Sequence, residues 1–366
     1  MTVVAVICEY NLFHSGHARL ISKIREHFGG DTAVISLMSG HFTQRGDVAA
    51  CDKYTRAGAA MLCGSDAVIE LPLPFSCSVG EIFARSSVDI LNSLGVVDYL
   101  AFGSESGDLE KISETAKNQL LPEFEEKIKE ELAKSDKEES YIRLRERVYE
   151  SMFGKRELLP NDTLALEYVT ALFLTDSKIK PFAVKREGKE TATASRALYL
   201  SGDYKALSSL VPQKLLDIYK GAAPHCISYA SRAVLFALRT MDSQKAGDCF
   251  GAKGGICERI ISSAKDSCTV NELYNKCVTK KYTEARIKRC VISMLLGITE
   301  KDVFCVPDKV LLLSANDRGC AVASEIRKNG SVSLVTRGSM TYGTLEARAD
   351  ALYSLCTPEP ENAVRF

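Results

Sequence analysis

Two histidines near the amino terminus, His14 and His17, have the type and spacing to bind a phosphate group and stabilise its charge. They are three residues apart, so they would share one face of a first helical turn, and Gly16 leaves the backbone there accessible. This turn directly follows an apolar segment that predicts a strand. A helix amino terminus attracts anions through its free N–H groups and its dipole. The pattern therefore predicts a site for a nucleotide whose phosphate is under attack.

The same two histidines also have plainer interpretations. A His-x-x-His pair can be one packing and one exposed histidine, or it can be part of a metal site. A metal site needs a third ligand, and His27, His41 and His225 show no ligand spacing. No two of the thirteen cysteines are spaced as CxxC, so a zinc ribbon is not indicated. We therefore predict phosphate binding by the histidines and no metal site built from protein ligands.

Polar loops follow two further apolar segments. Gln44 and Arg45 come after the segment at 33–39, and Gly103 comes at the end of the segment at 99–102. Open α/β sheets bind ligands outside the carboxyl ends of their strands, so these loops are expected beside the histidines. Gln44 and Arg45 are candidate phosphate or substrate contacts, and Gly103 allows a base or ribose to approach the backbone. For each loop the alternative is a plain surface turn.

A third group of candidates lies near a predicted strand at 179–184. Arg186 directly follows that strand. Thr193 and Arg196 begin a helix rich in hydroxyl groups, which offers a second phosphate contact or is an ordinary capped helix. Asn161 precedes another helix, where it either contacts a ligand or caps the helix. The residues alone leave these alternatives open.

Strands and helices alternate through the first 105 residues, which predicts an α/β fold with a Rossmann-like parallel sheet covered by helices on both faces. The predicted strands are Val3–Cys8, Ala33–Ser39, Ala67–Glu70 and Tyr99–Phe102, and the predicted helices are 15–27, 52–63 and 80–94.

A chain of 366 residues is long for a single core, so we predict two domains. Residues 1–200 form the predicted catalytic domain, with a charged helical insertion at 108–155. Residues 201–366 form a mainly helical domain that is predicted to bind RNA. Its predicted helices are 204–219, 226–240, 256–264, 271–278 and 283–296, with short strands at 303–313 and 331–335.

The charge balance requires any nucleic-acid affinity to come from a local patch. Forty-seven Lys+Arg residues face forty-seven Asp+Glu residues, for a formal net charge of zero. One segment, 276–289, carries six positive residues against one negative residue, with a tyrosine among them. Such a segment suits an RNA backbone and a splayed base, although a solvated helix is the alternative. The candidate RNA contacts are Lys280, Lys281, Tyr282, Arg286 and Arg289.

Several features predict a cytoplasmic protein. The thirteen cysteines are an odd number at irregular positions, which favours free thiols in a reducing compartment over a disulfide framework. The chain begins directly with a strand, without a basic segment or a cleavage site of small residues. No apolar run approaches the ~18 residues of a membrane span.

Eight motifs, within a match that runs in order from residue 3 to about residue 300, resemble those of the tRNA(Met) cytidine acetate ligase family, within the nucleotidyltransferases that carry HxGH or HIGH motifs. The family patterns are EYNPFHNGH, SGHFxQRG, DLVIELP, ADIFARGSVxIL, FGSE, PNNILxxxY, SATxIR and KTKRYT. The corresponding segments here are Glu9–His17, Ser39–Gly46, Asp66–Pro72, Glu81–Leu91, Phe102–Glu105, Pro160–Tyr168, Thr191–Arg196 and Val278–Thr283.

This resemblance implies a defined reaction. Acetate attacks the α-phosphate of ATP, and acetyl-adenylate then acetylates N4 of the wobble cytidine of elongator tRNA(Met), with release of AMP and pyrophosphate. His14 and His17 are the implied catalytic residues, and Mg²⁺ is expected with the triphosphate. The implied ATP contacts are Ile7, Glu9, Tyr10, Asn11, Phe13, His14, Gly16, His17, Leu20, Gly103, Asn161 and Arg186.

The sequence departs from the family pattern at several places, among them Thr191 and Ser195, which stand where serine and isoleucine are usual. Leu12 replaces a proline, Asp162 places a carboxylate near a site meant for anions, and the stretch after Arg186 is shorter than usual. Two other functions remain open. A nucleotidyltransferase for a small phosphorylated metabolite would use the same histidines but would not need a basic helical domain. A non-catalytic RNA-binding relative would fit the short stretch after Arg186 but not the retained histidines. The oligomeric state is also left open.

Overall fold

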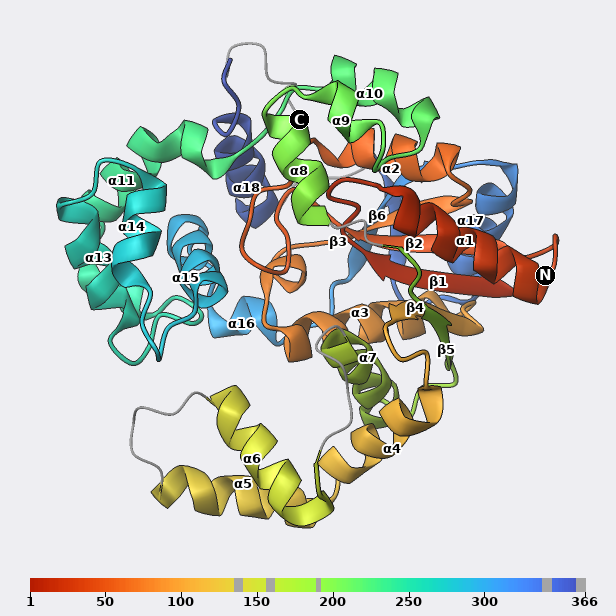
Figure 1. The fold of residues 1–366 in the computed structure, drawn as a ribbon, viewed down its shortest axis with the longest axis horizontal. Helices are drawn as coiled ribbons and strands as arrows, with labels where there is room; N and C mark the ends of the chain where they lie inside the picture. Colours follow the sequence, from red (N-terminus) through yellow and green to blue (C-terminus); the bar gives the residue numbers. More distant parts are fainter. Residues whose placement is uncertain (135–140, 156–161, 189–191, 338–343, 360–366) are drawn as a thin grey trace.

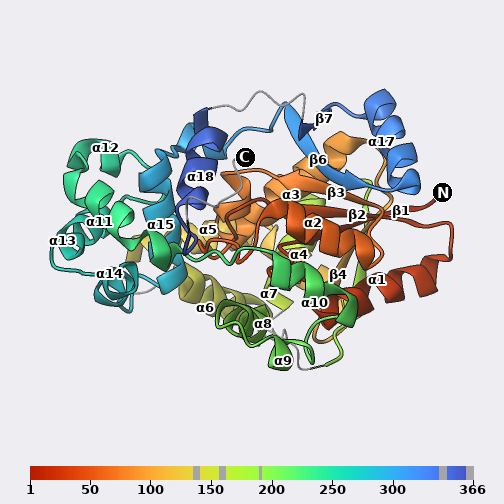
Figure 2. The same cartoon turned by 90° about the horizontal axis from the view of Figure 1, so that it is seen from above.

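A seven-stranded sheet forms the centre of the molecule (Figures 1 and 2). The computed structural model describes residues 1–134, 141–155, 162–188, 192–337 and 344–359. The strand order is β5-β4-β1-β2-β3-β6-β7. The strands are Val3–Cys8 (β1), Ala33–Ser39 (β2), Ala67–Leu71 (β3), Tyr99–Ser104 (β4), Lys180–Lys185 (β5), Lys309–Ala315 (β6) and Ser333–Thr336 (β7).

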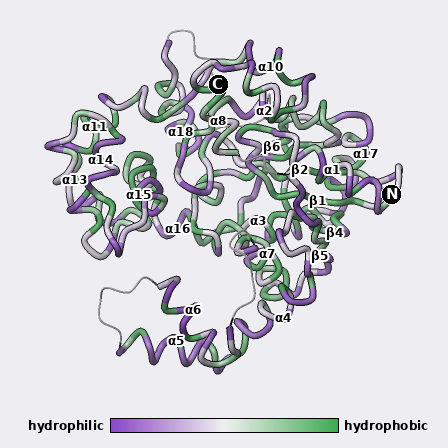
Figure 3. The backbone as a smooth tube through the Cα atoms, in the orientation of Figure 1, coloured by the Kyte–Doolittle hydropathy of each residue, from purple (hydrophilic) through white to green (hydrophobic). Residues whose placement is uncertain are grey.

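Helices cover both faces of the sheet, which confirms the predicted α/β fold. The first face carries Gly80–Leu94 (α3), Leu109–Gln119 (α4), Asp162–Leu174 (α7) and Asp317–Asn329 (α17). The second face carries Ser15–Phe28 (α1), Lys53–Leu62 (α2), Ala192–Leu200 (α8), Tyr204–Leu207 (α9) and Leu216–Gly221 (α10). All six residues of β1 are buried, and alternate ones belong to the two cores, as expected for a parallel strand covered on both sides. Hydrophobic residues accordingly gather in the strands in Figure 3.

The sheet also contains the two strands from the carboxyl-terminal part of the chain. β6 pairs antiparallel with β3, and β7 pairs parallel with β6. The sequence predicted short strands here but assigned them to the helical domain. The first prediction also began too early, because residue 303 ends a short helix, Glu300–Val303 (α16). Residues after 200 therefore contribute to the central sheet, and the division at residue 200 stays a prediction.

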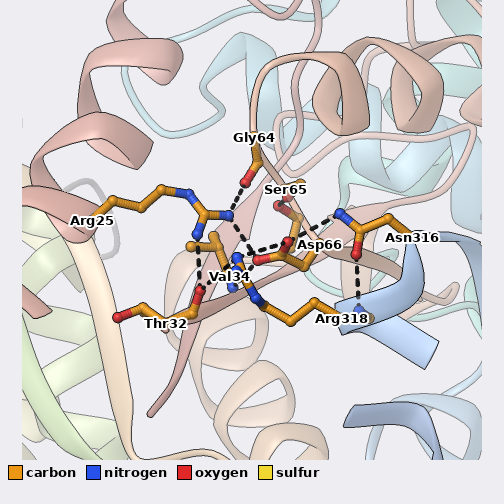
Figure 4. Close-up of polar contacts among 10 residues, drawn as sticks. Arg25, Thr32, Val34, Gly64, Ser65, Asp66, Asn316 and Arg318 are labelled. Carbon is orange, nitrogen blue, oxygen red and sulfur yellow. Dashed lines mark hydrogen bonds and ion pairs between the residues drawn. The ribbon is translucent and has the colours of Figure 1, made fainter. Parts of the chain in front are cut away.

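Asp66 joins these carboxyl-terminal elements to the start of β3 (Figure 4). Its Oδ2 accepts hydrogen bonds from the backbone N of Val34 at 2.8 Å and from Arg25 at 2.7 Å. Its Oδ1 accepts a hydrogen bond at 3.0 Å from Asn316, which caps α17. One buried carboxylate thus connects β2, α1 and α17 at the amino end of β3, whereas the histidines follow the carboxyl end of β1.

A separate helical core lies beside the sheet (Figure 1). The helix predicted at 204–219 is not continuous, because Pro212 has no N–H to continue a helix. The short 3₁₀ helix Gln213–Leu215 follows Pro212 and separates α9 from α10. Two further 3₁₀ helices are Phe75–Cys77 and Ile227–Ala230. The helices of this core are Ser231–Thr240 (α11), Ser243–Gly247 (α12), Ile256–Lys265 (α13), Val270–Cys277 (α14), Glu284–Leu296 (α15), α16 and Thr344–Ser354 (α18).

The segment predicted as a charged insertion, 108–155, begins with α4, which packs on the sheet, and continues as a pair of helices, Pro122–Lys134 (α5) and Tyr141–Phe153 (α6). They pack on each other through a small core that includes Phe124 and Tyr149. Figure 3 shows many hydrophilic residues along both helices. None of the helices in the described ranges is long and apolar enough to cross a membrane.

Candidate active site

The loop between β1 and α1 presents the two histidines at the amino terminus of α1. The Nδ1 of His14 accepts a hydrogen bond from the backbone N of Gly16 at 3.1 Å, and the Nδ1 of His17 accepts one from the backbone N of His14 at 3.1 Å. The two rings stack with their centroids 3.7 Å apart. Because each Nδ1 is an acceptor, each neutral imidazole carries its proton on Nε2. The pair therefore offers two Nε2–H donors at a helix amino terminus.

His17 stays neutral near physiological pH. Burial lowers its pKa well below the ordinary value, and the nearby His14 and Arg186 lower it further. Tyr10 packs its ring edge against His17, with the centroids 4.9 Å apart. A neutral imidazole at this position can donate a hydrogen bond to a phosphate oxygen without first having to gain a proton.

A large cavity of about 1080 Å³ opens beside the histidines, and we call it the central cavity. Its volume exceeds the usual range of roughly 300–1,000 Å³ for small-molecule sites, so it has room for more than a nucleotide. Its walls come from the ends of the strands, from α6 and from α15. The predicted nucleotide or substrate residues that line it are Ile7, Glu9, Tyr10, Asn11, His14, Gly16, His17, Leu20, Gln44, Arg45, Gly103 and Arg186.

Phe13 and Asn11 hold the histidine loop in place. The backbone N of Phe13 donates to the hydroxyl of Tyr219 at 3.1 Å, and the Phe13 ring lies in the core and not among the described cavity residues. The Asn11 side chain accepts a hydrogen bond from the backbone N of Ala50 at 2.8 Å. Asn161, also predicted to contact ATP, lies outside the described residues.

Arg196 and Thr193 support the same loop from α8. Arg196 donates to the backbone carbonyl of Asn11 at 2.9 Å and to the Thr193 hydroxyl at 3.2 Å. Neither side chain is among the described residues that line the central cavity. The expected phosphate contact does not fit this placement, because the Arg196 guanidinium is directed at the backbone of the loop.

Arg56 is a positioning residue that the sequence analysis missed. Its side chain is fully buried and donates to the backbone carbonyls of Glu9 at 2.6 Å and Ser39 at 2.9 Å, and also to those of Gly40 and Cys51. One guanidinium thus fixes the loops after β1 and β2 together. The only local signal was an arginine in the first turn of an amphipathic helix, which gives no indication of four carbonyl partners.

Gly103 and Arg186 lie against each other at the ends of β4 and β5. A Cβ at Gly103 would be 3.1 Å from the Cγ of Arg186, so the glycine lets this side chain lie close to the strand. The Asp162 carboxylate turns toward the loop after β4, where it accepts hydrogen bonds from the Ser104 hydroxyl at 2.7 Å and the backbone N of Glu105 at 2.8 Å.

Asp162 contacts the loop that follows Gly103, and its effect on a bound anion stays a prediction. Asp162 is fully buried, and it is not among the described residues that line the central cavity. Burial raises its pKa, but the hydrogen bonds from Ser104 and Ser106 outweigh that effect and hold the pKa below its ordinary value. Asp162 thus stabilises the loop that presents Gly103.

The loop after β2 connects the nucleotide edge of the sheet to α15. At one end, the backbone N of Gln44 donates to the Glu9 carboxylate at 2.8 Å. At the other end, Lys288 forms an ion pair with Asp47 at 2.8 Å, and Arg289 donates to the carbonyl of Gln44 at 3.1 Å. Burial raises the pKa of Glu9. Arg289 was predicted to bind RNA. In the structure its guanidinium instead contacts the backbone carbonyl of Gln44.

The basic segment differs in part from the prediction. Lys280 and Lys281 are exposed, and Arg286 is half-buried. Of these three residues, Lys281 and Arg286 line the central cavity. Tyr282 is only 7% exposed. Its hydroxyl donates to the carbonyl of Gly254, and Lys281 and Arg286 lie over its ring at 5.3 and 5.2 Å from the centroid. A base stacked on Tyr282 does not fit this burial.

Other charged or aromatic residues of the central cavity were not predicted. Arg19 and Lys23 of α1 lie near the histidines, and Arg19 donates to the carbonyl of Glu187 at 2.8 Å. Tyr141 and Arg145 belong to α6. Helices that only face solvent have the same charge pattern as α1 and α6. The sequence therefore gave no specific signal that these four residues line a cavity.

Comparisons with known proteins identify the family of the chain. The model of the HIGH Nucleotidyl Transferase family matches residues 1–365. The tRNA(Met) cytidine acetate ligase of Clostridium perfringens (strain SM101) is 32% identical over 98% of this chain and 96% of its own length. The ligase of the same name from Caldanaerobacter subterraneus subsp. tengcongensis is 31% identical over 94% of this chain and 91% of its own length.

A solved structure gives the same result for the fold. The crystal structure of Thermotoga maritima TmcAL bound with alpha-thio ATP has a TM-score of 0.90 and 26% identity, and the match covers 100% of this chain and 97% of that chain. The sheet and its histidine loop are those of an α/β nucleotidyltransferase. The chain belongs to the tRNA(Met) cytidine acetate ligase family and is an enzyme of the ligase class. The resemblance found in the sequence is confirmed.

Proposed function

We propose that the chain acetylates N4 of the wobble cytidine of elongator tRNA(Met), using ATP and acetate through an acetyl-adenylate. The observation that carries this proposal is the central cavity, which the histidine loop and the basic residues of α15 line together. The names of the relatives support the RNA substrate and the acetate, and the alpha-thio ATP bound to the Thermotoga maritima protein supports the nucleotide.

In the first step, a carboxylate oxygen of acetate attacks the α-phosphorus of ATP. The bond between that phosphorus and the oxygen bridging to the β-phosphate breaks, and pyrophosphate leaves. The Nε2–H groups of His14 and His17 donate to the α-phosphate oxygens, where negative charge builds in the transition state. Arg19, Lys23 and Arg186 line the same cavity and supply positive charge toward the phosphates.

In the second step, the cytidine N4 attacks the carbonyl carbon of the acetyl group. The bond from that carbon to the AMP oxygen breaks, AMP leaves, and N4 loses one proton. The reaction needs no acyl-thioester, because acetyl-adenylate is already an activated acyl donor. The cysteines that line the cavity, Cys8, Cys77 and Cys290, are buried thiols. Burial raises the pKa of both Cys77 and Cys290 to about 12, so neither is a thiolate near neutral pH.

Magnesium is expected with the triphosphate. No group of three His, Cys, Asp or Glu side chains within the described ranges could hold a metal ion. Phosphate oxygens and water would therefore supply most of the Mg²⁺ ligands, which is common for this ion in nucleotide sites. When bound, the ion would neutralise charge on the leaving pyrophosphate.

The RNA contacts of this proposal are the exposed basic residues around the start of α15, namely Lys280 and Lys281, together with Arg286. They would hold the backbone of the anticodon loop while the target base enters the central cavity, since sequence-specific RNA binders mostly target such single-stranded loops. This function places the protein with its tRNA in the cytoplasm.

The test is mass spectrometry of nucleosides from unmodified elongator tRNA(Met), after incubation with the protein, ATP and carbon-13 acetate. We expect labelled N4-acetylcytidine that disappears when ATP or acetate is omitted. ATP cleavage with acetate but without labelled tRNA would place the error in the choice of RNA. No cleavage of ATP would contradict the proposed reaction.

A further inference from the structure

The central cavity extends to the helical insertion, which no part of the mechanism above uses. Tyr141 and Arg145 of α6 line it, and so does Gln119 at the end of α4. Across the cavity lie Lys281 and Arg286. Figure 1 shows α6 on the side of the insertion nearer to α15 and α16. The insertion is therefore a second wall of the site, opposite the basic helix.

Tyr141 presents an open aromatic ring at this wall. The residue is 49% exposed. The Arg145 guanidinium lies 5.9 Å from the centroid of the ring. Arg145 is itself held by Gln119, whose Oε1 accepts a hydrogen bond at 3.0 Å, and it lies 4.0 Å from the Glu81 carboxylate. The cation beside the ring is thus fixed by two neighbours.

The other aromatic residues at the cavity are buried or half-buried. Tyr10, Phe83, Phe102 and Tyr168 are buried in the cores, and Phe250 is half-buried. The tyrosine of the basic segment, Tyr282, is buried as well. Among the described cavity residues, Tyr141 is therefore the one aromatic residue that is exposed.

We propose that Tyr141 and Arg145 form a stacking platform for an unpaired base of the RNA substrate. An exposed ring with a guanidinium beside it is the arrangement on which proteins stack single-stranded bases, and the basic residues opposite suit the backbone of the same strand. The platform rests on the proposed function, because it assigns a contact to the tRNA of that reaction. It gives the insertion a role in RNA binding that its charge pattern does not indicate.

The experiment compares the substitutions Tyr141→Ala and Tyr141→Phe with the wild-type protein. Tyr229→Ala is the matched control, since Tyr229 is also an exposed tyrosine but is not among the described cavity residues. Two reactions are measured. One is acetylation of unmodified tRNA(Met) at varied tRNA concentration, and the other is acetate-dependent exchange of labelled pyrophosphate into ATP without tRNA.

We expect Tyr141→Ala to raise the KM for tRNA about tenfold, as for the loss of one stacked base. The KM for ATP in the exchange reaction should change less than about twofold. Tyr141→Phe keeps the ring and should restore the wild-type KM for tRNA, and Tyr229→Ala should behave as wild type.

Two results would overturn the platform. An unchanged KM for tRNA in Tyr141→Ala would show that no base stacks there. A rise confined to the KM for ATP would show that the ring contacts the adenine of ATP instead. Both results require a wild-type enzyme that acetylates tRNA, so they differ from a failure of the proposed function, in which the wild type forms no acetylcytidine.

Discussion

The Nζ of Lys288 in α15 lies 2.8 Å from the Oδ1 of Asp47 in the loop after β2. Three residues earlier in that loop, the backbone N of Gln44 donates to the Glu9 carboxylate beside the histidines. The helix assigned to RNA and the edge of the sheet assigned to ATP are thus connected through one loop. A change on α15 should therefore be felt at the nucleotide.

The substitution Lys288→Met tests this connection. It removes one partner of a half-buried ion pair, so the loop should loosen and the KM for ATP should rise by about fivefold, or about 1 kcal/mol. The measurement is acetate-dependent pyrophosphate exchange without tRNA. Lys253→Met is the control, because Lys253 forms an exposed ion pair with Glu300 at 2.6 Å away from this loop. Equal values of KM for the two variants would contradict the connection.

His14→Asn separates the two functions of the His14 ring. Asparagine is a good N-cap and can still accept the hydrogen bond from Gly16, but it has no donor at the position of Nε2. Adenylate formation should fall about 100-fold or more, as for the loss of an oxyanion donor. Binding of tRNA and the melting temperature should change little. Full pyrophosphate exchange in this variant would exclude the Nε2–H as a phosphate donor.

Removal of charge from the basic segment should weaken tRNA binding in a salt-dependent way. Each of the substitutions Lys281→Met and Arg286→Met should make the slope of log affinity against log salt shallower by about 0.7–0.9 if that side chain neutralises one phosphate. Binding titrations at several salt concentrations measure the slope. The exposed Lys301, which is not among the described cavity residues, provides the control variant Lys301→Met. A slope that is flat in the wild type would contradict the RNA interface.

His225 should contribute to loss of stability in mild acid. Burial lowers its pKa below the ordinary value, so the unfolded chain takes up a proton near pH ~6.5 that the folded chain does not bind. Stability is then full above that pH and falls as the pH drops through it. In His225→Gln the fall between about pH 7.5 and 5.5 should be shallower by up to about 1.4 kcal/mol per pH unit.

Urea unfolding at several pH values measures this effect. His17 has a lowered pKa for the same reason and is present in both proteins, so its contribution cancels in the comparison. Asp350, whose pKa burial raises, cancels in the same way. Burial also lowers the pKa of His41, but the charge of His225 adds to that shift, so the difference between the two proteins includes this coupling. Parallel stability curves for the two proteins would show that His225 does not titrate differently on folding.

The nucleotide edge of the fold could be predicted from the sequence because its signals are local. A buried strand, a short loop and a helix occur within residues 3–28, so the local sequence is enough to place His14 and His17 at a helix amino terminus. The two polar loops after β2 and β4 follow the same rule, since the carboxyl ends of parallel strands share an edge.

The remaining features depend on contacts between distant segments. Ala67 pairs with Ala315 in the antiparallel ladder of β3 and β6, and nothing in either local pattern encodes that pairing. Tyr282 is buried because its hydroxyl reaches Gly254, which a count of basic residues cannot show. Arg56 acquires its role from carbonyls of separate loops. Periodicity and spacing therefore predicted elements and motifs. They did not predict which polar or charged side chains bond to distant parts of the same chain.

The most direct test of the proposed chemistry follows the oxygen atoms of acetate. The protein is incubated with ATP, unmodified tRNA(Met) and acetate that carries oxygen-18 in its carboxylate, and the released AMP is analysed by mass spectrometry. If acetate attacks the α-phosphate and N4 then attacks the acetyl carbon, each AMP retains one acetate oxygen, and we predict one oxygen-18 in AMP for each acetylcytidine formed. Acetylcytidine formed together with unlabelled AMP would contradict an acetyl-adenylate in the central cavity.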